Sequence, residues 1–377
     1  MIAGNLVLTW ALAQVFPPPE SEGGWRTLVP ANETPTAVQK DDVLEKTGLA
    51  WDKLLEAWTY SQTFGGPSQF VVIRKGWVAA EWLNYADARG IASCTKSLTG
   101  LCIAKLLDSS DAGKTAKRIG MDDAVHPYLP EAWSAPDARK KNIRLRHLLT
   151  MSSGLFPYDG PYPKAGKEYF DVTLSTGFES APETVWAYAS VPIDLMSLAI
   201  ENVTGKTEKE FFDREIGGPI GVPPVSWPTM GETAHTGGSG GPGGGARFKA
   251  RDLARVGYLL LHRGAWKGQQ VVSAARVQLF TGWAPWLEGA TFKAPNFSRT
   301  ADAQKYYGYT FWTNRTGILG PTVPADTFWM SGWGKQACWV VPSLDLVVVR
   351  LGAHRVLNDH PEYYRELWSR IMAAVAK

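Results

Sequence analysis

The stretch "GIASCTKSLTGL", residues 90–101, decides the fold that this sequence predicts. Ser93 and Lys96 stand three residues apart at the start of an apolar run, so on a helix both side chains share one face. A serine hydroxyl needs a neighbouring base to become a good nucleophile, and a lysine serves when burial lowers its pKa. At a helix N-terminus, the serine N–H can also help to bind an oxyanion. The motif alone fits equally a helix-capping serine beside a surface lysine.

The composition is that of an ordinary globular protein. Of 377 residues, 45% are hydrophobic and 20% are charged, and the net charge is +3 with both signs scattered along the chain. This length allows one large domain or two lobes, and the scattered charge argues against a nucleic-acid partner. The three cysteines lack CxxC spacing and the six histidines lack an HExxH pattern, so we expect neither a disulfide framework nor a metal site.

The N-terminal residues 1–13 are mostly apolar and end in Ala11-Leu12-Ala13, which resembles a small-residue cleavage site. They predict a signal peptide and hence a periplasmic or secreted protein. No Lys or Arg precedes the apolar run, so a buried strand or a mis-assigned start, with a cytoplasmic location, remains the alternative. The run is too short for a stable membrane span.

The order of elements predicts an α+β fold. Residues 14–48 are rich in Pro, Glu, Gly and Thr and predict an irregular arm. A hairpin is expected at "QFVVIRKGWVAAEW" (69–82), more strands at 327–352 and a closing helix at 361–377, with helices between them. We therefore expect an antiparallel sheet flanked by terminal helices, with a mostly helical lobe inserted. The predicted domain spans 49–377, with an α+β lobe at about 49–90 and 300–377 and a helical lobe at about 91–299.

Several segments in order resemble the serine β-lactamase and penicillin-binding-protein superfamily, especially class C β-lactamases, family VIII carboxylesterases and nylon-oligomer hydrolases. They are "ASCTKSLTG" (92–100), "IRLRHLLTMSSGL" (143–155), the stretch 185–222, the stretch 243–273 and "SGWGKQACWVVPSLDLVVVRLG" (331–352). S-x-x-K is a nucleophile motif of such enzymes. The resemblance implies a two-lobed, β-lactamase/transpeptidase-like serine hydrolase with its site between the lobes and no cofactor.

The second motif of class C relatives, Tyr-x-Asn, corresponds to Tyr188-Ala189-Ser190. By resemblance, Tyr188 faces Ser93 and Lys96, helps to deprotonate Ser93 and later protonates the leaving group. A tyrosine that simply packs in the helical lobe is the alternative. Ser190 is a candidate substrate-binding residue, but it reaches less far than Asn and weakens the case for recognition of a β-lactam side-chain amide.

The third motif is Lys-Thr-Gly in lactamases and Trp-Gly-Gly or His-x-Gly in some esterase relatives. The matching stretch here is Trp333-Gly334-Lys335-Gln336. We expect the first three residues to bind substrate and, by resemblance, the Gln336 N–H to join the Ser93 N–H as an oxyanion donor. Lys335 could replace the missing first-position charge, although strand alternation would turn it to the other face.

Two further segments are candidates for the border of the pocket. The glycine-rich loop 237–245 corresponds to a mobile loop in relatives, and a plain linker is the alternative. Tyr158, Tyr162 and Tyr169 could form an aromatic wall, or could belong to a packed loop.

The sequence thus predicts a serine hydrolase that cleaves an ester or amide bond in a small molecule or short peptide through an acyl-enzyme on Ser93. The changed second and third motifs favour a carboxylesterase or amidase over a β-lactamase or DD-peptidase. A non-catalytic binding or assembly protein of the same fold is the alternative from another class, and the intact Ser93, Lys96 and Tyr188 argue against it.

Overall fold

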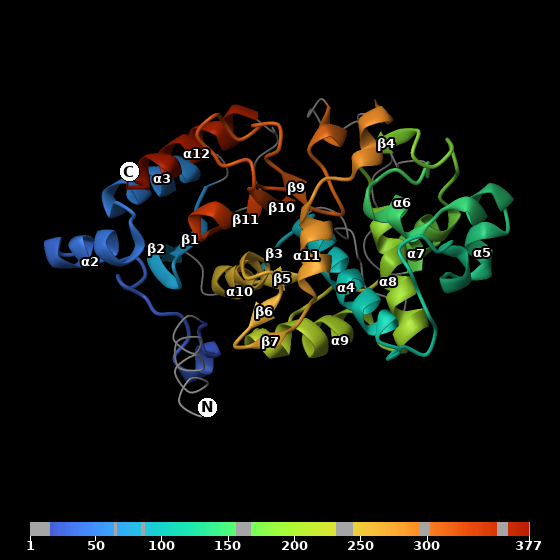
Figure 1. Ribbon diagram of the computed structural model, residues 1–377, viewed down its shortest axis with the longest axis horizontal. Coiled ribbons are helices and arrows are strands. Elements are labelled where there is room, and N and C mark those ends of the chain that lie inside the picture. The colour runs from blue at the N-terminus through green and yellow to red at the C-terminus, as the bar shows by residue number, and fades with distance from the viewer. Residues whose placement is uncertain are drawn as a thin grey trace, which may run out of the picture.

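The computed structural model describes residues 16–63, 66–83, 87–155, 167–230, 244–293, 302–352 and 361–376, so the predicted signal peptide lies outside the described residues. A six-stranded sheet in the order β2-β1-β12-β11-β10-β9 forms its centre, and each neighbouring pair is antiparallel. Strands from both ends of the chain share this sheet (Figure 1). The strands are β1 Ser68–Arg74, β2 Trp77–Leu83, β9 Trp312–Thr313, β10 Phe328–Gly332, β11 Gln336–Val341 and β12 Leu346–Gly352.

The strands β1 and β2 form the hairpin predicted around Lys75-Gly76. Both turn residues have positive φ, 51° at Lys75 and 74° at Gly76. This combination is typical of a type I′ turn, whose twist matches that of the flanking strands. The hairpin prediction is confirmed.

Helices cover both faces of the sheet. The helices α3 (Trp51–Gln62) and α12 (Pro361–Ala374) pack against each other over one face, although they come from opposite ends of the chain (Figure 1). The other face packs against α4 (Cys94–Asp111) and α10 (Ala250–Leu261). Since both faces are covered, β12 is buried along its whole length, and its sequence is apolar except for Arg350. The predicted antiparallel sheet with flanking terminal helices is confirmed.

The remaining elements are mostly short and helical. The helix α4 contacts both β10 and α8, so it joins the sheet to the helical region. In the described part of the chain, no helix combines the length and the apolarity needed to cross a membrane. The other α-helices are α2 Ala37–Thr47, α5 Glu131–Ser134, α6 Leu145–Leu149, α7 Lys167–Ser175, α8 Val191–Thr204, α9 Glu208–Phe212 and α11 Ala274–Thr281. The short strands are β3 Arg89–Gly90, β4 Val185–Ala187, β5 Arg247–Phe248, β6 Ala265–Trp266, β7 Gln269–Gln270 and β8 Thr291–Lys293.

The prediction of an irregular arm at 14–48 is wrong for α2. The side chain of Thr36 accepts the Gln39 N–H, and the Gln39 side chain accepts the Thr36 N–H, which together make a capping box. Gly48 then ends the helix in the left-handed conformation, with φ 67°. These start and stop signals outweigh the polar composition of the segment.

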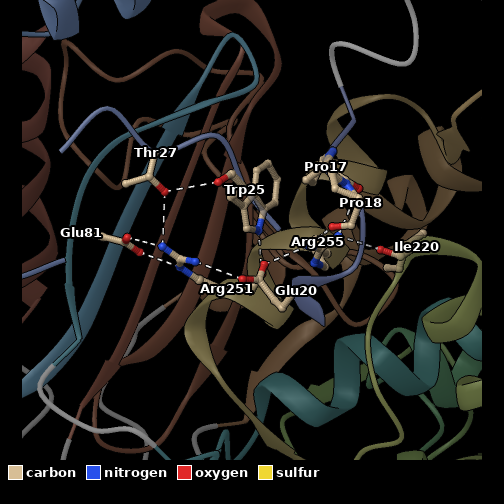
Figure 2. A network of polar contacts seen from close by, with 9 residues as sticks. All are labelled: Pro17, Pro18, Glu20, Trp25, Thr27, Glu81, Ile220, Arg251 and Arg255. Carbon is tan, nitrogen blue, oxygen red and sulfur yellow. Dashed lines mark hydrogen bonds and ion pairs between the residues drawn. The ribbon is translucent and has the colours of Figure 1, made fainter. Parts of the chain in front are cut away.

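The first part of the arm is fastened to α10 by Arg255 (Figure 2). The Arg255 side chain is fully buried, and burying a guanidinium is costly unless its N–H groups are bonded. It donates to the carbonyl oxygens of Pro17 (3.3 Å), Pro18 (2.5 Å) and Ile220 (3.2 Å), and it pairs with Glu20 at 2.9 Å. The arm is therefore an ordered part of the fold.

Replacing Glu20 by alanine is expected to destabilise the protein. Glu20 is shared by Arg255 at 2.9 Å and Arg251 at 3.0 Å, so its loss takes the carboxylate partner from a buried guanidinium. Because Glu20 itself is partly exposed, we expect a loss of about 2 kcal/mol rather than the larger cost of breaking a fully buried pair. Urea unfolding measures this change. Glu22→Ala removes a neighbouring exposed carboxylate and should cost less than about 0.5 kcal/mol; equal losses in the two variants would contradict the prediction.

Candidate active site

Ser93 lies at the end of a tight turn directly before α4. The preceding residue, Ala92, has φ 48°, in the left-handed region that residues other than glycine rarely adopt. The turn is held by the residues just before β5, because the Ile91 N–H donates to the Ala246 oxygen at 2.9 Å and the Ala92 N–H to the Gly244 oxygen at 3.1 Å. Backbone strain that the surroundings impose in this way is concentrated at functional sites.

The described end of the glycine-rich loop, residues 244 and 245, packs against this turn. Gly245 has φ 79°, and a Cβ there would lie 2.3 Å from Thr95 Oγ1 and 2.7 Å from the Ala92 oxygen. Only a residue without a side chain allows so close an approach. Residues 237–243 of the loop lie outside the described residues.

Lys96 is buried beside the Ser93 hydroxyl, one helical turn further along α4. Its Nζ donates to Ser93 Oγ at 2.9 Å and to Ser190 Oγ at 3.1 Å, and the side chain is 1% exposed. Burial lowers the pKa of Lys96 to about 8, against the opposing effect of the negative charge on Asp194. An amine with this pKa is partly neutral near physiological pH, as a base for Ser93 must be.

Tyr188 follows β4 and lies next to Lys96. The Lys96 Nζ is 4.9 Å from the centre of the Tyr188 ring. The ring is half-buried among other aromatic rings, with centroids 5.7 Å from Trp312, 5.9 Å from Tyr307 and 6.3 Å from Trp186. The structure thus brings Tyr188 and Ser190 to Ser93 and Lys96, across more than ninety residues of sequence.

The sequence analysis missed Asp194. This residue lies in the first turn of α8, completely buried, and its Oδ2 accepts the Tyr169 hydroxyl at 2.7 Å. Tyr169 is buried in α7, so it packs inside the protein instead of forming an aromatic wall. A lone aspartate in the apolar run "VPIDLMSLAI" is the signal that could have identified it. Tyr158 and Tyr162 lie outside the described residues.

Trp333, Gly334 and Lys335 form the turn between β10 and β11 instead of lying on a strand. Trp333 is 41% exposed, whereas the Lys335 side chain is buried. The Lys335 Nζ lies over the Tyr363 and Tyr364 rings of α12, 5.4 and 5.0 Å from their centres. Since α12 covers the sheet face opposite α4, this ammonium group points away from Ser93, and its position does not support the predicted substrate contact.

Gln336 is the first residue of β11 and is held inside the sheet. It is paired with Gly332 of β10, and its side-chain amide exchanges two hydrogen bonds with the backbone of Gly352, at 3.0 and 2.8 Å. Gly332 is instead the residue that meets the nucleophile turn. A Cβ at Gly332 would lie 2.2 Å from the Ile91 oxygen and 3.2 Å from the Cys94 nitrogen.

Successive residues of β10 direct their backbone N–H and C=O groups alternately toward β9 and toward β11. The Thr327 oxygen accepts the Asn314 N–H at 2.7 Å, on the β9 side. By strand alternation, Ser331 and Trp333 also direct their backbone groups to this side, while Gly332 faces β11. On β10, the described pairing with β9 covers Phe328 and Trp329, so the edge beyond them is where backbone donors near Ser93 would be found.

Within the described ranges, no group of three or more His, Cys, Asp or Glu side chains is arranged to hold a metal ion. The three cysteines are buried and unbridged.

Comparisons with known proteins show what the chain is similar to. D-alanyl-D-alanine-carboxypeptidase/endopeptidase AmpH of Escherichia coli (strain K12) is 29% identical over 141 residues, which are 35% of this chain and 34% of that protein, so the match spans about a third of the relative. A structure assigned as a 6-aminohexanoate-dimer hydrolase from Bacillus anthracis has a TM-score of 0.63 at 17% identity, covering 98% of this chain and 93% of that one. A family VIII carboxylesterase has a TM-score of 0.58 at 15% identity, covering 85% and 97%.

The family itself is shown by the sequence model named Beta-lactamase, which matches residues 69–368. This match covers the nucleophile turn, the Tyr188 segment and most of the sheet, and it confirms the resemblance found in the sequence. The chain belongs to the Beta-lactamase family.

Proposed function

We propose that this protein is a serine hydrolase that cleaves an ester or amide through an acyl-enzyme on Ser93. The observation that carries the proposal is the 2.9 Å contact between the buried Lys96 amine and the Ser93 hydroxyl at the start of α4. Neutral Lys96 takes the hydroxyl proton as Ser93 Oγ bonds to the substrate carbonyl carbon. The bond to the leaving group then breaks and the leaving group takes a proton. Water finally hydrolyses the acyl-serine and restores the hydroxyl.

Two neighbours of Lys96 complete the proton path in this proposal. Tyr188 shares the proton with Lys96 and returns it to the leaving group, which is consistent with its ring lying 4.9 Å from Nζ. The hydroxyl of Ser190 accepts a hydrogen bond from Nζ at 3.1 Å and so holds the amine toward Ser93. We therefore assign Ser190 to the orientation of Lys96 in addition to any contact with substrate.

For the oxyanion we propose the N–H groups of Ser93 and Trp333, in place of Gln336. The close approach of Gly332 to the Ile91 oxygen supports an alignment in which Met330-Ser331-Gly332 is the third motif. The residue after this trio is Trp333, whose N–H faces the outer edge of β10 by alternation. The Gln336 N–H faces Gly332 across the ladder.

An esterase or amidase fits these features better than a β-lactamase or DD-peptidase. The third motif lacks its leading lysine, and the ammonium group of Lys335 lies over the rings of α12. Lactamases bind the substrate carboxylate with the positive charge of that lysine. These residues offer no equivalent charge at that position, so they bind such a carboxylate less well.

The proposal is tested by incubating the protein with a fluorophosphonate probe and locating the modified residue by peptide mass spectrometry. We expect modification of Ser93 and turnover of p-nitrophenyl butyrate. Rapid turnover of nitrocefin, or release of terminal D-alanine from a peptide, without ester hydrolysis would favour the β-lactamase or DD-peptidase alternative. No labelling and no hydrolysis would favour a non-catalytic protein of this fold.

Replacing Gly332 by alanine is expected to lower kcat/KM for p-nitrophenyl butyrate by about 100-fold, since a displacement of about 1 Å at a catalytic group can have that effect. The added Cβ would meet the backbone oxygen of Ile91 at 2.2 Å, so β10 and the nucleophile turn must move apart. Gly289→Ala is the matched control, because a Cβ at Gly289 meets nothing within 4 Å. Similar activity in both variants would contradict the prediction.

A further inference from the structure

The turn 333–335 is held from inside the sheet by Arg350 of β12. The Arg350 side chain is fully buried, and its Nη1 donates to the Gly334 oxygen at 3.1 Å and to the Lys335 oxygen at 3.0 Å. Its Nη2 donates to the Ser61 oxygen at 3.1 Å, near the C-terminal end of α3, where a positive charge is favourable. One rigid guanidinium therefore links the turn to the helix layer on the far side of the sheet.

The surrounding residues are shaped around this guanidinium. A Cβ on Gly352 would lie 2.4 Å from Arg350 Nη1, so only glycine leaves the present position open. The Tyr363 hydroxyl donates to the same Ser61 oxygen at 3.3 Å, and its ring lies 5.9 Å from the Arg350 guanidinium carbon. Burying a guanidinium is costly unless hydrogen bonds compensate it. An apolar side chain of similar size could fill this part of the core without that cost.

The bonded carbonyls belong to the two residues that follow Trp333. Gly334 has φ 77°, which costs a glycine nothing, but Lys335 has φ 63°, a left-handed conformation that residues other than glycine rarely adopt. The Trp333 N–H belongs to the peptide unit between Gly332 and Trp333, whereas the two bonded oxygens belong to the units 334–335 and 335–336 of the same turn. Holding these oxygens fixes the turn that begins at Trp333, and so limits the movement of the end of β10 that carries the Trp333 N–H.

We propose that Arg350 is a positioning residue for catalysis, which orients the Trp333 N–H toward the oxyanion by fixing the carbonyls of Gly334 and Lys335. The assignment rests on the proposed function, since it concerns the same site. It differs from a purely structural role because it predicts an effect on transition-state binding beyond any effect on stability.

The test compares three variants by steady-state hydrolysis of p-nitrophenyl butyrate and by thermal unfolding. R350K keeps the charge but loses the fork that reaches two carbonyls. G352A keeps Arg350 and displaces its guanidinium through the added Cβ. R255K is the matched control, because Arg255 is also fully buried and also donates to backbone carbonyls, but those of the N-terminal arm and Ile220 (Figure 2).

We expect kcat to fall at least about tenfold in R350K and G352A while KM stays within about twofold, as when an interaction made mainly in the transition state is weakened. The pH midpoint of activity should not move, because Lys96 is untouched. R255K should lower the melting temperature and leave kcat within about twofold of the wild type. If R350K does not fold, the kcat of G352A alone tests the positioning role of Arg350.

Two outcomes overturn the assignment alone: kcat within twofold of the wild type in the folded R350K or G352A variants, or an equal loss of kcat in R255K. A wild-type protein without Ser93-dependent hydrolysis overturns the proposed function and the assignment with it. The two failures are therefore distinguished by the activity of the wild type.

Discussion

Replacing Ser93 by alanine is expected to reduce ester hydrolysis by at least about 10⁴-fold, because no other step can proceed without the nucleophilic oxygen. The oxyanion donors and the substrate-binding surface remain in this variant, so a small residual rate above that in water is expected. Hydrolysis of p-nitrophenyl butyrate measures the rate. Mass spectrometry of the intact protein should find an acyl adduct on the wild type and none on the variant.

Ser97→Ala is the control for this experiment. Ser97 lies on α4 about one turn after Ser93, is buried where Ser93 is half-buried, and donates its hydroxyl to the Thr310 oxygen at 2.6 Å. Its loss should cost stability of about 1 kcal/mol and leave an acyl adduct on Ser93. An adduct that persists in Ser93→Ala, or disappears in Ser97→Ala, would contradict the assignment of the nucleophile.

The contact between Ser93 and Lys96, the proposed nucleophile and base, could be predicted from the sequence because the two residues are close along the chain. Ser93 and Lys96 lie within one helical turn, so spacing alone determines that they can meet, and Lys96 Nζ lies 2.9 Å from Ser93 Oγ. The β1–β2 hairpin is local in the same sense, since the Lys75-Gly76 pair carries the backbone conformation that its turn needs.

The register that we propose for the third motif differs from the one expected from the sequence, because it depends on contacts distant along the chain. The letters Trp333-Gly334-Lys335 match an esterase motif, but Ser331-Gly332 offers small residues just before them. The close approach of Gly332 to Ile91 determines which of these residues lie beside Ser93, and these two residues are about 240 positions apart in the sequence. Because Gly332 pairs with Gln336, residues 333–335, which match the esterase motif, lie in the turn between β10 and β11.

The positions of the buried charged residues Asp194 and Arg350 also could not be predicted from the sequence. Asp194 affects Lys96 from another helix, and its partner Tyr169 lies 25 residues earlier, so no local pattern connects the three. Arg350 has no motif of its own in the apolar run "LVVVRLG", where a buried cation is the exception. By contrast α2 should have been predicted, since the Thr36-x-x-Gln39 box and Gly48 are ordinary helix signals.

Replacing Lys96 by methionine is expected to lower kcat by about 10³-fold, within the usual range for loss of a general base. In the wild type, burial lowers the pKa of Lys96 to about 8, so the active neutral amine increases as pH rises. Activity should therefore rise with pH to a midpoint near 8, and at pH 6 about 1% of the amine is neutral. The methionine variant should lose this rise, which a pH profile of kcat/KM measures. Folding stability is not expected to fall, because methionine removes a buried amine without adding a charge.

Two further variants separate the base from the charge. Lys96→Arg keeps a positive charge beside Ser93 but stays protonated throughout the accessible pH range, so it should be as inactive as the methionine variant. Lys105→Met removes a half-buried lysine further along α4, whose Nζ donates to the Val271 oxygen at 2.8 Å, and should keep the pH midpoint of the wild type. Activity of Lys96→Arg within tenfold of the wild type would mean that the charge suffices, and Tyr188 would then be the base. A loss in Lys96→Arg with the rise retained in Lys105→Met would assign the proton transfer to the Lys96 amine.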